Sequence, residues 1–73
     1  MSQSYFFSIN MSTQDFLPYY QGRVQSLVVT TTTGLRVEFP AMHLRKYVDS
    51  LGVRGLFCLK TDQGKFVSLT RIN

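Results

Sequence analysis

The stretch GLRVEFPAMHLRKYV, residues 34–48, decides the fold, because two different periodicities meet in it at Pro40. Ahead of the proline, Leu35, Val37 and Phe39 alternate with charged residues, which is the two-residue period of a half-buried strand. Proline has no amide hydrogen to donate to a neighbouring strand, but its fixed φ suits the first turn of a helix. We therefore expect an inward-facing apolar strand that ends at the proline and a helix that begins directly after it.

The helix after the proline is predicted to run over residues 41–51. Leu44, Val48 and Leu51 follow one another at spacings of four and three residues, which places all three on one face of an α-helix. Gly52 then supplies the stop signal. The charged residues between the apolar ones are expected to face elsewhere.

The rest of the chain is a series of short segments separated by turn signals, without a repeat or a linker. Ser12 stands three residues before Asp15, which is the spacing of a capping box, and predicts a short helix that ends at Gly22. Pro18 lies inside that helix and predicts a kink, because it removes an amide donor. The segments with a strand pattern are residues 5–11, 23–31, 35–39, 53–60 and 65–72.

These segments predict a single α+β domain over residues 1–73, in the order β-α-β-β-α-β-β. About five short, mostly antiparallel strands and two short helices are expected, with the strands in a curled sheet or a small open barrel. Gly55 falls inside the strand over residues 53–60 and predicts a bulge or a tight bend there.

The second faces of three predicted strands are more apolar than water-facing positions usually are. A helix, closure of the sheet or another subunit would have to cover such a face. We therefore expect a protein partner or self-association through it. The apolar residues in question are Leu27, Val29, Leu56, Val67 and Leu69.

Composition limits the classes of function. A chain of 73 residues has little core to spare for a deep ligand pocket, so we expect a non-enzymatic protein. The N-terminal residues lack the pattern of a secretory signal, and no apolar run reaches the length of a membrane span. A single cysteine, Cys58, rules out an internal disulfide and suits the cytoplasm. The net charge of +4 favours an anionic partner, although such an excess is common in proteins without one.

Candidate catalytic and metal-binding residues are few. His43 is the only histidine, and with Cys58 it would make a base and a nucleophile, but no third residue or oxyanion-hole signature accompanies the pair. We interpret His43 as an exposed helix residue and Cys58 as a packing residue. The four carboxylates have structural explanations as a cap, surface charges and a turn residue. No cofactor and no metal are predicted.

Nucleic-acid binding is the alternative function. Basic residues flank the proline corner and would contact the phosphates of RNA or single-stranded DNA, while exposed tyrosines would offer stacking surfaces. A smaller anionic ligand such as a nucleotide, held by two of the same arginines, Arg36 and Arg45, is a third hypothesis. The predicted nucleic-acid or anion contacts are Arg36, Arg45, Lys46 and Arg54.

Three segments together span nearly the whole chain: YFFSINMSTQDFLPYYQG, GLRVEFPAMHLR and GVRGLFCLKTDQGKFVSLTRI. They resemble a family of small bacterial proteins catalogued as a domain of unknown function. Pro18 departs from the pattern, which has an ordinary helix former there. The resemblance implies a shared fold and no assigned reaction, cofactor or ligand.

Residues 34–45 are also similar to a strand-proline-helix corner in the small N-terminal domain of the gamma-butyrobetaine hydroxylases. The chain lacks the cysteine and histidine set with which that domain holds zinc, so this similarity implies no metal site.

Overall fold

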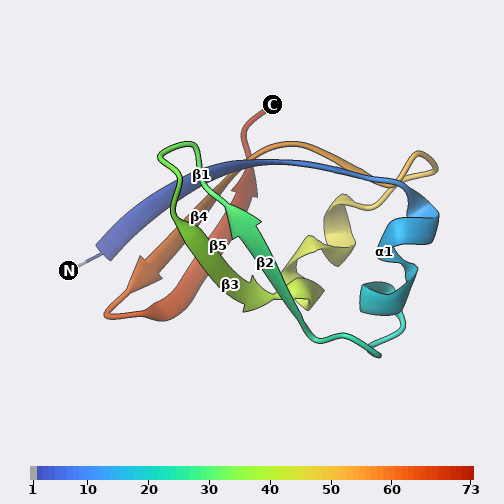
Figure 1. Ribbon diagram of the computed structural model, residues 1–73, viewed down its shortest axis with the longest axis horizontal. Coiled ribbons are helices and arrows are strands. Elements are labelled where there is room, and N and C mark those ends of the chain that lie inside the picture. The colour runs from blue at the N-terminus through green and yellow to red at the C-terminus, as the bar shows by residue number, and fades with distance from the viewer. Residues whose placement is uncertain (1) are drawn as a thin grey trace.

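Five strands and two short helices follow one another in the predicted order (Figure 1) in a computed structural model that describes residues 2–73. The α+β class and the order β-α-β-β-α-β-β are thereby confirmed. The elements are β1 (Ser2–Met11), α1 (Thr13–Tyr20), β2 (Ser26–Thr30), β3 (Arg36–Pro40), the 3-10 helix η1 (Ala41–Tyr47), β4 (Val53–Asp62) and β5 (Lys65–Arg71).

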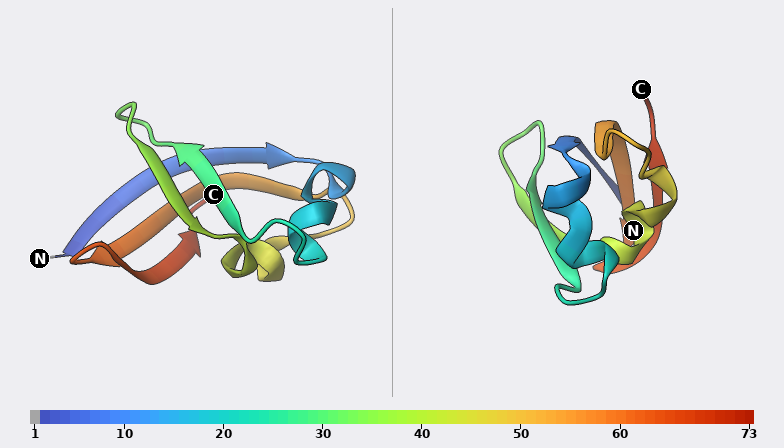
Figure 2. Two further views of the ribbon diagram at one scale, coloured as in Figure 1. Left: turned by 60° about the horizontal axis from the view of Figure 1, so that its bottom comes forward. Right: turned by 90° about the vertical axis from the view of Figure 1, so that its right-hand side faces the viewer.

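The strands form two antiparallel sheets. β1, β4 and β5 make a three-stranded sheet with β4 in the centre, and β2 pairs with β3 as a separate hairpin. The hairpin lies across one face of the larger sheet (Figure 2). The Thr32 N–H donates to the Phe6 carbonyl oxygen over 2.8 Å and ties the hairpin loop to β1. The sheet is unclosed, as expected for a curled sheet or a small open barrel, and the strands divide between two sheets rather than forming a single one.

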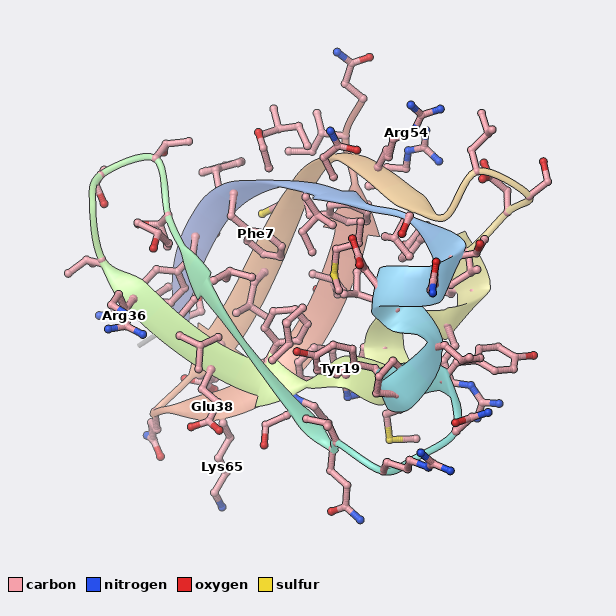
Figure 3. The ribbon with its side chains drawn as sticks, turned by 45° about the vertical axis from the view of Figure 1, so that its right-hand side comes forward. Phe7, Tyr19, Arg36, Glu38, Arg54 and Lys65 are labelled. Atoms are coloured by element: carbon pink, nitrogen blue, oxygen red, sulfur yellow. The ribbon has the colours of Figure 1, made fainter. Side chains whose placement is uncertain are left out.

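The core lies where the two sheets and the two helices meet. The ring centroid of Phe7 in β1 is 5.5 Å from that of Phe39 in the hairpin and 5.8 Å from that of Phe57 in β4. Figure 3 shows Phe7 between the sheets. Phe7 and Ile9 are buried while their neighbours in β1 are exposed, which confirms the predicted alternation. Burial of each large apolar side chain contributes about 1.5–3 kcal/mol to folding.

The second helix differs from the prediction in type and length. η1 is a 3-10 helix that ends at Tyr47, and Val48 is already extended with ψ of 130°. A 3-10 helix has three residues per turn, so Ala41, Leu44 and Tyr47 form one column, and this column faces the core. The predicted α-helical face is therefore wrong at Leu51, which lies in the following turn and is 61% exposed.

Several strand boundaries also differ: β1 begins at Ser2 rather than at residue 5, and β4 extends to Asp62 rather than ending at residue 60. β2 begins at Ser26 rather than at residue 23. Leu35 was predicted to face inward, but it lies in the hairpin loop and is 55% exposed. Its backbone explains this, because the Leu35 N–H donates to the Thr31 hydroxyl and the Leu35 carbonyl accepts from the Thr31 N–H. These two hydrogen bonds between Leu35 and Thr31 close the hairpin loop. The predicted helix cap is present, since the Asp15 N–H donates to the Ser12 hydroxyl over 3.0 Å.

Two glycines are required by close backbone approaches. Gly52 has φ of +108°, and a Cβ there would overlap the Met11 carbonyl oxygen at the end of β1. Gly55 has φ of +140°, and a Cβ there would lie 2.6 Å from the Asn73 carbonyl oxygen. A bulge or a tight bend was predicted at Gly55; its pairing with β1 continues unbroken, so no bulge interrupts that pairing. The register shift lies instead between β4 and β5, at residues 60 and 61.

Candidate functional site

The three-residue repeat of η1 sends its exposed side chains in two directions. Met42 and Arg45 form the column that faces α1, where the Arg45 guanidinium lies 4.5 Å from the ring centroid of Tyr20. The next column faces β5, where the ring of His43 stacks on Phe66 with centroids 3.7 Å apart. One short helix therefore presents polar side chains to two different surfaces.

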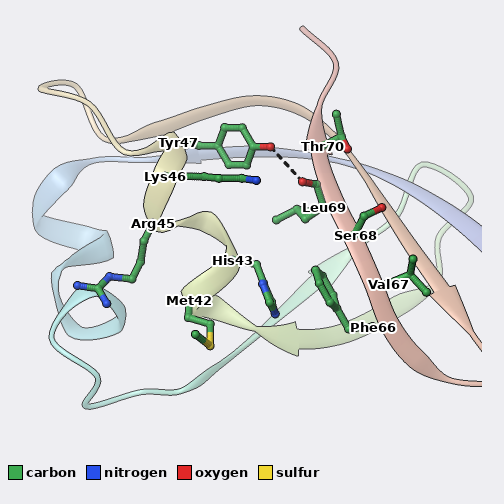
Figure 4. Close-up of a pocket in the computed structure, with 10 residues that line it drawn as sticks. All are labelled: Met42, His43, Arg45, Lys46, Tyr47, Phe66, Val67, Ser68, Leu69 and Thr70. Carbon is green, nitrogen blue, oxygen red and sulfur yellow. Dashed lines mark hydrogen bonds between the residues drawn. The ribbon is translucent and has the colours of Figure 1, made fainter.

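The four basic residues predicted to contact nucleic acid do not share one surface. Arg36 begins β3 in the hairpin and Arg54 lies near the start of β4, and Figure 3 shows them on different sides of the molecule. Arg45 and Lys46 are neighbours in η1, but their side chains point in different directions (Figure 4). The structure thus brings two of the four together on one helix and separates the others.

The five apolar residues predicted to form an interaction face are also divided. Leu27 is 9% exposed and Leu69 is 5% exposed, and both belong to the core. Val29 shares the strand face of Leu27 by the two-residue period and packs against the same core. Leu56 is half-buried, and only Val67 is largely exposed. The predicted face is therefore not an exposed one, because the facing sheets cover two of its members.

Exposed apolar side chains gather instead around Arg45, between α1 and η1. A groove of about 550 Å³ is lined by Tyr20, Val24, Met42 and Arg45 among others. A smaller groove of about 270 Å³ adjoins it, lined by Leu17 together with the same tyrosine and arginine. The four apolar side chains are all more than two-fifths exposed. We call this set the Arg45 surface: Leu17, Tyr20, Val24, Met42 and Arg45.

A third groove, of about 630 Å³, lies between η1 and β5 (Figure 4). One wall comes from η1, including His43 and Lys46, and the other from the consecutive residues 66–70 of β5. The Tyr47 hydroxyl donates to the Leu69 carbonyl oxygen over 3.0 Å and holds the two walls together. We call it the η1–β5 groove. Met42 and Arg45 line both this groove and the Arg45 surface, so the two are continuous.

The formal charges on these surfaces are all positive. Arg45 and Lys46 line the grooves, and none of the residues that line any of the three is acidic. The four acids are elsewhere in the chain, in the first turn of α1, in β3, in the turn after η1 and at the end of β4. An anionic group that enters the grooves therefore meets no like charge from their walls.

Cys58 and His43, the candidate nucleophile and base, lie in different surroundings. Cys58 is buried in β4, paired with Phe6 and Thr70 on the neighbouring strands, whereas the ring of His43 is held against Phe66. Among residues 2–73, no three histidine, cysteine or carboxylate side chains lie close enough together to hold a metal ion. Over the same residues, no helix is long and apolar enough to cross a membrane.

The Arg45 surface was only partly predictable. Arg45 was among the predicted contacts, but Leu17, Val24 and Met42 were not. α1 has eight residues, and Phe16 is its only buried one. A helix of two turns with four large apolar or aromatic residues offers more apolar surface than it can bury, and this excess is the signal that points to the surface.

Comparison with known protein families matches residues 3–72 to the family described as "Protein of unknown function (DUF2835)". The match spans nearly all of the chain, so the chain belongs to this family, as its motifs predicted. No match was found among curated proteins. No solved structure was matched either.

Proposed function

We propose that this member of a family of unknown function is a non-enzymatic bacterial protein of the cytoplasm that binds another protein through the Arg45 surface. The partner segment carries both acidic and apolar side chains. The observation that carries the proposal is the cluster of four exposed apolar side chains around one guanidinium group, on grooves whose only formal charges are positive.

The composition of the surface supports a protein partner. Tyrosine, methionine and arginine are enriched at the centres of protein–protein interfaces, and here Tyr20, Met42 and Arg45 line one groove. Methionine is also flexible enough to adapt to differently shaped partners. The surface is hollowed rather than flat, so side chains of a partner would be removed from water on several sides.

The charge of the surface favours a different protein over a second copy of this chain. In a symmetric dimer the same patch meets itself, so the interface would contain two copies of Arg45 and no carboxylate from the groove linings to pair with them. Removing two like charges from water costs free energy, and the two charges repel each other instead of offsetting that cost. A partner with carboxylates removes this cost, and we therefore expect the isolated protein to be a monomer.

Nucleic acid is the less well supported partner. Phosphate contacts provide most of the affinity of a non-specific nucleic-acid site, and they require several cations on one surface. The cations predicted for this role are divided among separate surfaces, as Figures 3 and 4 show. Leu17, Val24 and Met42 are exposed beside Arg45. Contact with apolar side chains of a protein would remove their apolar surface from water, whereas contact with phosphates would not replace that water with apolar surroundings.

Selection of displayed random peptides tests the proposal. The wild-type protein is the target, and the Arg45→Glu variant serves for counter-selection. We expect the recovered peptides to combine aspartate or glutamate with large apolar residues. Their Kd should rise at least tenfold for Arg45→Glu and for Met42→Asp, whereas Lys60→Glu should change it less than threefold. Lys60 is the matched control because it is exposed on β4 and lines none of the grooves.

Several results would overturn the proposal. Recovery of peptides without acidic residues, or equal losses for Arg45→Glu and Lys60→Glu, would exclude the Arg45 surface as the binding site. Failure to enrich any peptide would do the same. A salt-sensitive affinity for single-stranded RNA or DNA that Arg45→Glu abolishes would transfer the function to nucleic-acid binding.

A further inference from the structure

The η1–β5 groove runs along the open edge of a sheet. β5 is an edge strand, because the order of the sheet is β1-β4-β5. Successive side chains of a strand point to opposite faces, so a groove on one face would touch only every second residue. This groove touches the five consecutive residues 66–70, and it must therefore follow the edge of the strand.

The backbone of β5 presents hydrogen-bonding groups to this groove. The Leu69 carbonyl accepts from the Tyr47 hydroxyl, so it points away from β4 and toward η1. The N–H and C=O groups of one strand residue point to the same edge, and the edge alternates from residue to residue. The Ile72 N–H accordingly points the other way and donates to Leu56 of β4. The Leu69 N–H and the backbone groups of Arg71 thus face the open edge.

η1 stands beside this edge at a fixed position. The ring of Tyr47 packs edge-on against Phe57, with centroids 5.2 Å apart, while its hydroxyl reaches the Leu69 carbonyl. Lys46 and His43 line the groove from the column of η1 that faces β5, with Phe66 opposite them. A strand edge on one side and a basic helix wall on the other would hold an extended chain between them.

We propose, on the basis of the function proposed above, that the partner segment binds in the η1–β5 groove as an extended strand added to β5. Its main-chain groups pair with the open-edge groups of β5, namely the Leu69 N–H and the backbone groups of Arg71, and a carboxylate on it pairs with Lys46. Main-chain pairing of this kind supplies affinity, while side-chain contacts supply selectivity. Because Met42 and Arg45 line this groove and the Arg45 surface alike, one segment can follow both.

Backbone methylation of the tightest selected peptide tests the mode of binding. A series of variants of that peptide carries one N-methyl group at each position in turn, which removes one N–H donor. For a strand added to β5, losses of at least tenfold in affinity should alternate with losses below threefold, because only every second N–H faces the edge. Hydrogen exchange of the Leu69 amide should slow at least tenfold when the unmodified peptide binds.

A charge exchange tests the role of Lys46. Lys46→Glu should weaken binding at least tenfold, and a peptide with lysine in place of its critical glutamate or aspartate should restore it. Lys60→Glu is again the control and should leave the affinity within threefold. Urea unfolding of each variant confirms that the fold is intact.

The outcomes separate the two proposals. Peptides that depend on Arg45 but show no alternation, no protection of Leu69 and no loss in Lys46→Glu would overturn strand addition and leave the proposed function standing. If no acidic peptide binds the wild type, both proposals are refuted. Binding of single-stranded RNA or DNA that Lys46→Glu abolishes would also overturn strand addition.

Discussion

Replacement of Gly52 by alanine should destabilise the protein strongly, for two separable reasons. A residue with a side chain at φ of +108° is strained, which costs about 1–3 kcal/mol. The added methyl group would also overlap the Met11 carbonyl oxygen and lie within 2.7–2.8 Å of two backbone atoms of Ser12. Backbone atoms cannot rotate aside as the end of a side chain can, so the turn must move away from the end of β1.

The size of the effect follows from what that movement disturbs. Two backbone hydrogen bonds join Asp49 and Gly52, at 2.9 and 3.0 Å, and each contributes about 1 kcal/mol. With the strain, we expect Gly52→Ala to lower the free energy of unfolding by about 3–5 kcal/mol. A chain of this size is stabilised by only about 4–11 kcal/mol in total, so the variant should lose a large part of its stability.

Gly34→Ala is the matched control. Gly34 has φ of +89°, but a Cβ there meets no atom within 4 Å, so only the conformational strain should appear. Urea unfolding followed by circular dichroism should give a loss of about 1–2 kcal/mol for Gly34→Ala and about 3–5 kcal/mol for Gly52→Ala. Equal losses in the two variants would refute the close approach of Gly52 to the end of β1.

Three further substitutions probe the cap, the core and the tie between η1 and β5. Ser12→Ala removes the acceptor for the Asp15 N–H and should cost about 1 kcal/mol in urea unfolding, whereas an effect below about 0.3 kcal/mol would contradict the cap. Phe57→Ala removes a fully buried ring and should cost about 3–5 kcal/mol, so that thermal melting shows little cooperative transition; a melt like that of the wild type would contradict the core. Tyr47→Phe removes the bond to the Leu69 carbonyl and should cost about 1 kcal/mol, with faster exchange of amides in β5; unchanged exchange would contradict the tie.

The elements that depend on neighbouring residues were predictable from the sequence. The cap at Ser12 needs only the Asp15 amide three residues later, and the strand end at Pro40 needs only the missing amide hydrogen. The alternation that buries Phe7 and Ile9 is also a property of one strand. These signals were sufficient for the class and order of the fold.

The features that depend on distant contacts were not predictable. Leu27 sits in a strand with an apolar run, and only the packing of the hairpin against the larger sheet decides that its side chain points into the core. The column that the 3-10 helix turns toward the core ends at Tyr47, whose hydroxyl is bonded to Leu69, 22 residues away, whereas an α-helix was predicted from local spacing alone. Leu51 was misassigned for this reason.

In the candidate site too, features set by neighbouring residues were predictable from the sequence and features set by distant contacts were not. The basic character of Arg45 and Lys46 is visible in the sequence, but their divergence follows from the geometry of η1. That Arg36 and Arg54 lie on other sides of the molecule depends on how the strands pack. The one local signal of the Arg45 surface is the number of large apolar and aromatic residues on α1, which exceeds what a helix of eight residues can bury on one face.

An NMR titration tests the location of the binding surface most directly. Amide signals of the ¹⁵N-labelled wild-type protein are followed as the tightest selected acidic peptide is added. We predict that the shifted signals belong to α1, to η1 and to residues 66–70 of β5, the elements that line the three grooves. Shifts confined to the β2–β3 hairpin, or to Phe6 and Leu56 in the larger sheet, with α1 and η1 unchanged, would contradict the account.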